Sequence, residues 1–297
     1  MRLLILILLF SISAQGQIVR THPYYRPPVS GCSYLLDQYS GNKVAISLRK
    51  VKCGYTGALV RIRRSNDNSE QDIYPVSGGV EIDTSAILSF VGSNSAYVVK
   101  WYNQSGFGDA ITVVSSQQAR IVNAGTIERV NGKVAVYADG GDLYAIASLQ
   151  LYTYNATFAV SKSNTPFLIV EHSVEANIND GFYFYTSNNG PWLFRRTSVN
   201  YASGVANWAG TDQVITSLQY NSSGGVYYKN GTAQSNGTVT GSTLSNTQTT
   251  KDLYILARNG PVAPLTGYFQ ELLLWDSDQS ANRTAIEANI NSYYSVY

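Results

Sequence analysis

Short runs of strand-forming residues, separated by turn signals, occupy most of the chain between residues 42 and 275 and constrain its fold more than any other feature. Residues 44–49 and 58–64 alternate apolar and polar side chains, which is the pattern of a half-buried strand. Further runs of this kind lie at 97–102, 134–137, 157–160, 167–170, 182–185, 214–218, 253–257 and 268–275. Many short strands, with few helical segments between them, predict an antiparallel sandwich or barrel.

Asn-Gly pairs mark the turns between several of these runs, at residues 131–132, 189–190 and 230–231. Both residue types tolerate a positive φ, which the tight turns of β-hairpins require. The pairs therefore predict hairpins and antiparallel pairing.

Two segments are predicted to be helical. Residues 84–90 lie between Thr84, a capping residue, and Gly92, a stop signal. After Ser280, which can also cap a helix, apolar residues recur at helical spacing, namely Ile286, Ile290 and Tyr293 or Tyr294. This second segment is predicted to be an amphipathic helix that closes one side of the sandwich.

The first residues have the pattern of a secretory signal peptide. Arg2 precedes an apolar run at 3–10, and small or polar residues follow it up to Gly16. The apolar run is shorter than the roughly 20 residues that cross a bilayer, so no membrane insertion is expected. The sequence predicts a secreted, extracellular protein with a signal peptide at 1–16, an N-terminal arm at 17–31 and one β-sandwich domain at 32–297.

Cys32 and Cys53 are the only two cysteines of the chain. In an oxidising compartment an isolated pair of cysteines usually forms a disulfide bond. We therefore predict a bond that ties the N-terminal arm to the strand around residues 44–51. A metal site or a reactive thiol is the alternative.

Charge and missing motifs exclude several classes of partner. The formal net charge is +2 and only 13% of the residues are charged, so nucleic acid is not a predicted partner. The two histidines, His22 and His172, are too few for a multi-histidine zinc site, and no phosphate-binding or dinucleotide motif is present. No cofactor is predicted apart from a structural calcium ion that Asp139 and Asp142 could bind; the alternative there is a turn with Asx hydrogen bonds. The oligomeric state stays open.

Longer motifs give a family resemblance. They are Tyr55-Thr-Gly-Ala-Leu-Val-Arg-Ile-Arg-Arg64 followed by residues 73–79, Trp101-Tyr-Asn-Gln-Ser-Gly-Phe-Gly108, and Val130-Asn-Gly-Lys-Val-Ala-Val136. Together they resemble the N-terminal half of the catalytic domain of fungal-type α-L-arabinofuranosidase B. The resemblance implies an all-β, concanavalin A-like jelly-roll sandwich of two antiparallel sheets with a short C-terminal helix. Similar segments also resemble lectin-like domains of bacteria and phages.

The same resemblance implies that the sugar-cleaving site is lost. The position that matches the family's nucleophilic glutamate falls on or near Ser198, and no carboxylate occurs from Pro191 to Thr211. The loop that carries the family's general acid corresponds to residues 258–264, which also lack a carboxylate. The adjacent cysteine pair of the family is missing as well.

Two other acids could replace the lost pair. Glu171 belongs to the cluster Glu171-His172-Ser173, and Glu271 lies in the last apolar run. As catalytic acids they would have to face one groove at a separation of about 5 to 10 Å. The structural interpretation places Glu171 at a strand end with a solvated turn and makes Glu271 the anchor of a neighbouring loop.

The concave face of the larger sheet is the predicted ligand surface. Aromatic faces stack on sugar rings, and the candidates for this contact are Trp192, Tyr183, Tyr185 and Trp208. Three functions follow from the sequence: a non-catalytic, lectin-like carbohydrate-binding or adhesion protein, an α-L-arabinofuranosidase acting on arabinose-containing polysaccharide, and a structural surface or appendage scaffold. The missing acids favour the first over the second.

Overall fold

The computed structural model describes residues 32–297 except 153, 164, 166, 175–176, 186–191, 197–198, 204–211, 223, 235–238 and 241–247. Residues Ser33–Tyr297 form one compact unit. The predicted signal peptide at 1–16 and arm at 17–31 lie outside the described residues, so these boundaries stay predictions.

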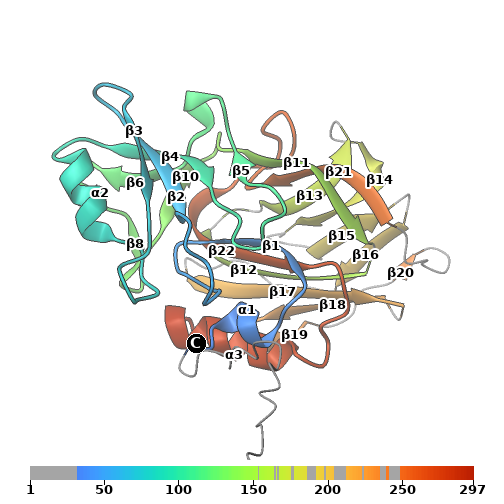
Figure 1. Cartoon of the computed structure of the whole chain (residues 1–297). Helices are drawn as coiled ribbons and strands as arrows, with labels where there is room; N and C mark the ends of the chain where they lie inside the picture. Colours follow the sequence, from blue (N-terminus) through green and yellow to red (C-terminus); the bar gives the residue numbers. More distant parts are fainter. Residues whose placement is uncertain are drawn as a thin grey trace, which may run out of the picture. The chain divides into compact units, whose positions relative to one another are not determined.

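One layer of the structure, here called the back layer, is built on strand β22 (Thr266–Trp275) (Figure 1). Strand β1 (Asn42–Ser47) pairs with the second half of β22, and β10 (Val136–Asp139) pairs with its first half. On the other side of β22 the antiparallel order continues through β12 (Asn155–Ser163), β17 (Gln213–Asn221), β18 (Gly224–Lys229) and β19 (Thr232–Ala233).

A second layer, the front layer, consists of another run of antiparallel strands. Its order is β5 (Ala110–Ile111), β11 (Tyr144–Tyr152), β21 (Gln248–Ile255), β13 (Leu168–Val174), β14 (Asn177–Tyr185), β15 (Trp192–Arg196), β16 (Val199–Ser203) and β20 (Val239–Thr240).

A smaller group of strands connects the two layers. It contains β3 (Glu70–Ile73), β2 (Val60–Arg64), β4 (Ala96–Trp101), β6 (Arg120–Asn123) and β7 (Thr126–Ile127). Strand β4 pairs with β5 of the front layer, and β6 pairs with β10 of the back layer. The all-β sandwich is therefore as predicted, but its layers are joined by continuous hydrogen bonding. A separate hairpin pairs β8 (Arg129–Val130) with β9 (Lys133–Val134).

The main hydrophobic core lies between the two layers. Alternate residues of each strand point into it, as the two-residue period of a strand requires. The back layer contributes Ile46, Leu218, Leu272 and Leu274, and the front layer contributes Ile146, Val170, Phe184, Leu253 and Ile255.

A second apolar cluster lies on the outer face of the back layer, where helices α1 (Leu35–Gln38) and α3 (Arg283–Tyr294) cover the strands (Figure 1). Trp275 packs edge-on against Phe158 at 5.6 Å between ring centroids. Other members are Leu35, Leu36, Leu273, Ile286, Ile290 and Tyr294. Because both faces are covered, β1 is almost wholly buried instead of alternating as predicted for 44–49.

Both predicted helices are present, although their starts differ from the prediction. Helix α2 (Thr84–Val91) ends at Gly92 as predicted, but Asp83 is its cap and accepts a hydrogen bond from the backbone N–H of Ala86 at 2.9 Å. Helix α3 begins after Ser280, whose N–H and hydroxyl donate to Asp278 instead. None of the helices in the described part of the chain is long and apolar enough to cross a membrane.

Two of the three predicted Asn-Gly turns are confirmed. Asn131 and Gly132 join β8 to β9, and Asn230 and Gly231 join β18 to β19. All four residues have φ between 47° and 75°. The pair at 189–190 lies outside the described residues.

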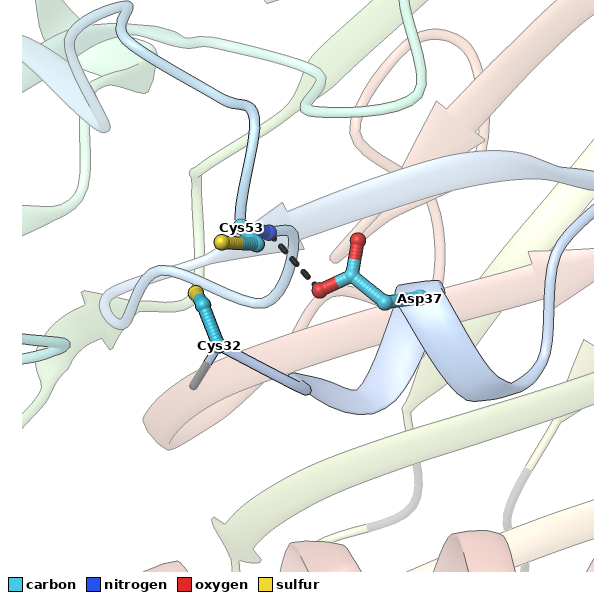
Figure 2. Close-up of side chains that lie close together, drawn as sticks. All are labelled: Cys32, Asp37 and Cys53. Carbon is cyan, nitrogen blue, oxygen red and sulfur yellow. Dashed lines mark hydrogen bonds between the residues drawn. The ribbon is translucent and has the colours of Figure 1, made fainter. Parts of the chain in front are cut away.

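The predicted disulfide bond between Cys32 and Cys53 is confirmed, because both cysteines are disulfide-bonded and the chain has no others. Asp37 lies beside them (Figure 2), and its Oδ2 accepts hydrogen bonds from the backbone N–H of Cys53 at 2.9 Å and of Tyr34 at 3.0 Å. The ligand atoms of Cys32, Asp37 and Cys53 lie within 4.8 Å of one another. Since both sulfurs are used in the bond, this cluster does not offer thiolates to a metal.

Candidate functional site

The outer face of the front layer, called the outer front face below, carries a row of residues placed by strand register. Val170 and Ile255 are paired across β13 and β21 and point into the core. The next pair, Glu171 and Tyr254, therefore points outward. Across the neighbouring strand β14, the backbone of Tyr183 lies opposite Glu171.

Glu171 is held by Arg258 at this face. The Arg258 Nε and Nη2 atoms both donate to the carboxylate, each at 3.0 Å, while Glu171 is 0% exposed. Arg258 follows β21, in the segment where it pairs with Val262. Two parallel N–H···O bonds fix the position and orientation of the carboxylate.

The cluster at 171–173 lies near the end of a strand, as the structural interpretation has it, since β13 ends at Val174, but Glu171 and His172 are buried and not solvated. Strand β13 continues through these residues and is paired on both sides, with β14 and β21. His172 is only 1% exposed, and its Nε2 lies 2.8 Å from the carbonyl oxygen of Leu149. Burial lowers the pKa of His172 to about 4, so the imidazole is neutral at pH 7.

Glu271 lies on the other layer and faces helix α3. It accepts hydrogen bonds from Arg49 Nε at 2.8 Å, Arg49 Nη2 at 3.0 Å, the Ser47 hydroxyl at 2.6 Å and the Tyr294 hydroxyl at 3.2 Å. Glu171 instead points out of the front layer towards Arg258. The structure does not bring the two acids into one groove, and the contacts of Glu271 are those of an anchor between β1, β22 and α3.

The predicted aromatic ligand contacts occupy neighbouring strands of the front layer. Tyr183 and Tyr185 belong to β14, and Trp192 is the first residue of β15. In the register of these strands, Tyr183 pairs with Arg195. Trp208 lies outside the described residues. The role of these four residues as ligand contacts stays a prediction.

Arg258 and Arg49 are the residues that sequence reasoning missed. Each is an isolated arginine far along the chain from the glutamate that it binds. Arg258 is 87 positions from Glu171, and Arg49 is 222 positions from Glu271. No local sequence pattern predicts an ion pair between residues so far apart. The position of Arg258 in a loop without a carboxylate was the only available signal.

Asp139 and Asp142 form hydrogen bonds within a turn. The Asp142 Oδ2 atom accepts from the backbone N–H of Asp139 at 2.8 Å, and Asp139 Oδ1 accepts from the N–H of Gly141 at 3.2 Å. These bonds fit the Asx turn, and backbone N–H groups directed at both carboxylates do not favour a bound cation. Calcium binding stays a prediction. Burial raises the pKa of Asp142 to about 6.

This raised pKa predicts a pH-dependent stability. Folded Asp142 keeps its proton up to about pH 6, whereas the unfolded chain loses it at about pH 4. Between these values the unfolded state binds fewer protons, so the free energy of unfolding falls as pH rises. In the wild type we expect the free energy of unfolding to fall by roughly 2 kcal/mol between pH 4 and pH 7. Asp142→Asn is expected to remove this pH dependence, and urea unfolding at pH 4 to 7 measures it. Asp139→Asn is the matched control. If calcium stabilised the wild type but neither variant, the two aspartates would form a calcium site and not only an Asx turn.

Comparisons with known proteins agree on one family. The family model described as "Alpha-L-arabinofuranosidase B, catalytic" matches residues 44–192. A probable α-L-arabinofuranosidase B of Aspergillus flavus and an α-L-arabinofuranosidase B of Aspergillus oryzae are each 36% identical over 64 residues. That match covers 22% of this chain and 13% of each relative.

Solved structures show the same fold. A variant of a GH54 α-L-arabinofuranosidase, soaked with 4-nitrophenyl α-L-arabinofuranoside, superposes with a TM-score of 0.62 at 13% identity and covers 87% of this chain. An arabinofuranosidase complexed with arabinofuranosyl-α-1,2-xylobiose has a TM-score of 0.57 at 14% identity and covers the same share. The chain spans 65% and 64% of these two structures.

Proposed function

The chain belongs to the family of α-L-arabinofuranosidase B catalytic domains, and on this premise we propose that it is a secreted protein that binds arabinose-containing polysaccharide without hydrolysing it. The observation that carries the proposal is the state of Glu171, the acid at the outer front face. It is fully buried and paired through both oxygens with Arg258.

Hydrolysis with retention needs two carboxylates about 5 Å apart, one as nucleophile and one as general acid. A general acid must direct an oxygen at the leaving group, and both oxygens of Glu171 accept hydrogen bonds from Arg258 instead. A nucleophilic carboxylate must approach the sugar, and Glu171 is 0% exposed. Positioned acid–base catalysis contributes about 10² to 10⁴ to the rate, which this arrangement does not supply.

Binding needs less from the protein than turnover does. Aromatic side chains contribute apolar surface for sugar rings, and Tyr183, Tyr185 and Trp192 belong to the neighbouring strands β14 and β15 of the front layer. The disulfide between Cys32 and Cys53 supports an oxidising, extracellular location.

The test combines a binding and a turnover measurement on the secreted chain. We expect calorimetry to detect binding to arabinan, and we expect no release of nitrophenol from 4-nitrophenyl α-L-arabinofuranoside above the uncatalysed rate. Trp192→Ala is expected to weaken arabinan binding about tenfold, the loss for roughly 1.4 kcal/mol of stacking. Tyr74→Ala, which replaces an exposed aromatic residue between β3 and α2, is the control.

The hydrolase is the second candidate, because family membership itself favours it. It predicts turnover of the aryl arabinofuranoside that Glu171→Gln abolishes. That result would replace the binding proposal with an enzyme whose acid is freed from Arg258 when substrate binds. If the protein neither bound arabinan nor hydrolysed the aryl arabinofuranoside, the remaining candidate would be a structural scaffold.

A further inference from the structure

A row of cationic and tyrosine side chains crosses six neighbouring strands on a second outer surface. The strands are β2, β4, β6, β10, β22 and β12, and each adjacent pair is in direct register. The residues, in spatial order, are Arg63, Tyr97, Arg120, Tyr137, Tyr268 and Lys162. We call them the cation–tyrosine row.

All members of this row point away from the core. In each strand at least one residue that flanks the member of the row is buried, for example Ile62 beside Arg63, Val136 beside Tyr137 and Ser161 beside Lys162. Because side chains alternate along a strand, the row lies on the opposite face. Every member is partly exposed. Strands lie about 4.8 Å apart, so the row crosses about 24 Å of surface.

Ring contacts hold the row in order. The Arg63 guanidinium lies 5.2 Å from the Tyr97 ring centroid, and that of Arg120 lies 4.9 Å from Tyr137. Tyr137 and Tyr268 meet edge to face at 5.2 Å. The side chains are therefore ordered before any ligand arrives, which reduces the entropy cost of binding.

The row has excess positive charge. Arg120 is paired with Glu128 at 2.8 Å. Arg63 binds only the amide oxygens of Gln118 and Asn68, and no carboxylate among the described residues pairs with it or with Lys162. The two ends of the row thus present cations that form no ion pair with a described residue, although Glu70 lies opposite Arg63 in the register of β2 and β3. Tyrosine rings lie between the two ends.

We propose that the cation–tyrosine row binds an acidic polysaccharide built from uronic acids. Such a chain repeats a sugar ring, whose C–H face packs on tyrosine, and a carboxylate, which Arg63 and Lys162 can bind. This surface contains none of the residues of the outer front face, so the inference does not depend on the proposed function.

Other anionic partners fit the row less well. Tight binding of nucleic acid needs many phosphate contacts, and only two cations here lack a counter-charge. A membrane surface needs large exposed apolar side chains, whereas this row consists of tyrosines and cations. A linear glycan with one carboxylate per sugar supplies both the negative charge for the cations and the sugar rings for the tyrosines.

The experiment measures binding to polygalacturonate and to its methyl-esterified form, which has the same sugars without the charge. We expect the wild type to bind polygalacturonate at least tenfold more tightly than the ester. Arg63→Gln and Lys162→Gln should each weaken binding about tenfold, the loss expected for one charge-assisted hydrogen bond. Tyr97→Leu should weaken binding to both polymers.

Lys52→Gln removes an exposed cation outside the row and is the matched control. Trp192→Ala should leave polygalacturonate binding unchanged, which separates this surface from the outer front face. Circular dichroism establishes that each variant is folded; if Tyr97→Leu is not, the two charge variants decide alone. The proposal would be overturned if the wild type did not bind polygalacturonate or bound the ester equally well. It would also be overturned if the two charge variants bound as tightly as the wild type, or if DNA bound as tightly as polygalacturonate at equal polymer charge.

Discussion

Replacing Glu271 by glutamine is expected to lower the free energy of unfolding by about 3–5 kcal/mol, the range for breaking a buried ion pair from one side. Glu271 is 0% exposed and Arg49 is 6% exposed. Burial works against the charged guanidinium, but pairing with Glu271 outweighs it and holds the pKa of Arg49 above its ordinary value. The variant therefore leaves a buried cation that does not lose its proton. Urea unfolding followed by tryptophan fluorescence measures the loss.

Two further variants sharpen this test. Asp67→Asn breaks the exposed pair with Arg64 and should cost far less, because solvent screens surface pairs. Replacing both partners, as Arg49→Met with Glu271→Leu, should restore most of the stability, since no charge is left buried. An equal loss in Glu271→Gln and Asp67→Asn would contradict a structural role for the buried pair.

Removing the disulfide by the double change Cys32→Ala and Cys53→Ala is expected to cost about 3 kcal/mol. The bond closes a loop of about 20 residues and restricts the unfolded chain, which is where most of its effect arises in the chain-entropy model. The double change avoids a single free thiol that would form mixed disulfides. Thermal and urea unfolding measure the difference.

Reduction of the wild-type protein gives an independent estimate of the same quantity. The reduced wild type and the double variant should unfold at the same urea concentration. If reduction lowers stability but the double variant does not, the effect comes from the reductant or from the two free thiols, because the chain has no other cysteine.

Sequence patterns predicted the strands that have strong local signals and missed those that depend on neighbours. The two-residue alternation at 58–64 and the apolar run at 268–275 correspond to β2 and β22. Strand β16 (Val199–Ser203) has no such signal and is defined by its pairing with β15 and β20. Its partner β15 directly precedes it, but β20 is distant in sequence, with Asn200 opposite Thr240, and local propensity does not register such a partner.

The burial of β1 shows a second limit. The alternation of apolar and polar residues at 44–49 predicted that one face of the strand is exposed to solvent. Helices α1 and α3 cover that face instead. Ser47 and Arg49, which looked like solvent-facing residues, bind Glu271 under α3. A polar residue in a strand can face water or a buried partner, and only the partner's position distinguishes the two.

The candidate sites were predictable to different degrees. The missing carboxylates of the two loops were visible in the sequence, and so was Glu171 as an unusual acid. That Arg258 neutralises Glu171 follows only from the three-dimensional approach of β13 and the segment after β21. The cation–tyrosine row takes one residue from each of six strands, so no stretch of sequence contains it.

The pairing of β1 with β22 has a consequence for how the chain reaches its fold. Asn42 lies opposite Trp275, so β1 pairs with a strand that is synthesised much later. Loop closure over such a distance makes folding slow. Until β22 emerges, the apolar residues of β1 have no partner strand, and they need protection from aggregation during synthesis. A truncated chain that lacks β22 is thus expected to lose the back layer as a whole, and not one edge strand.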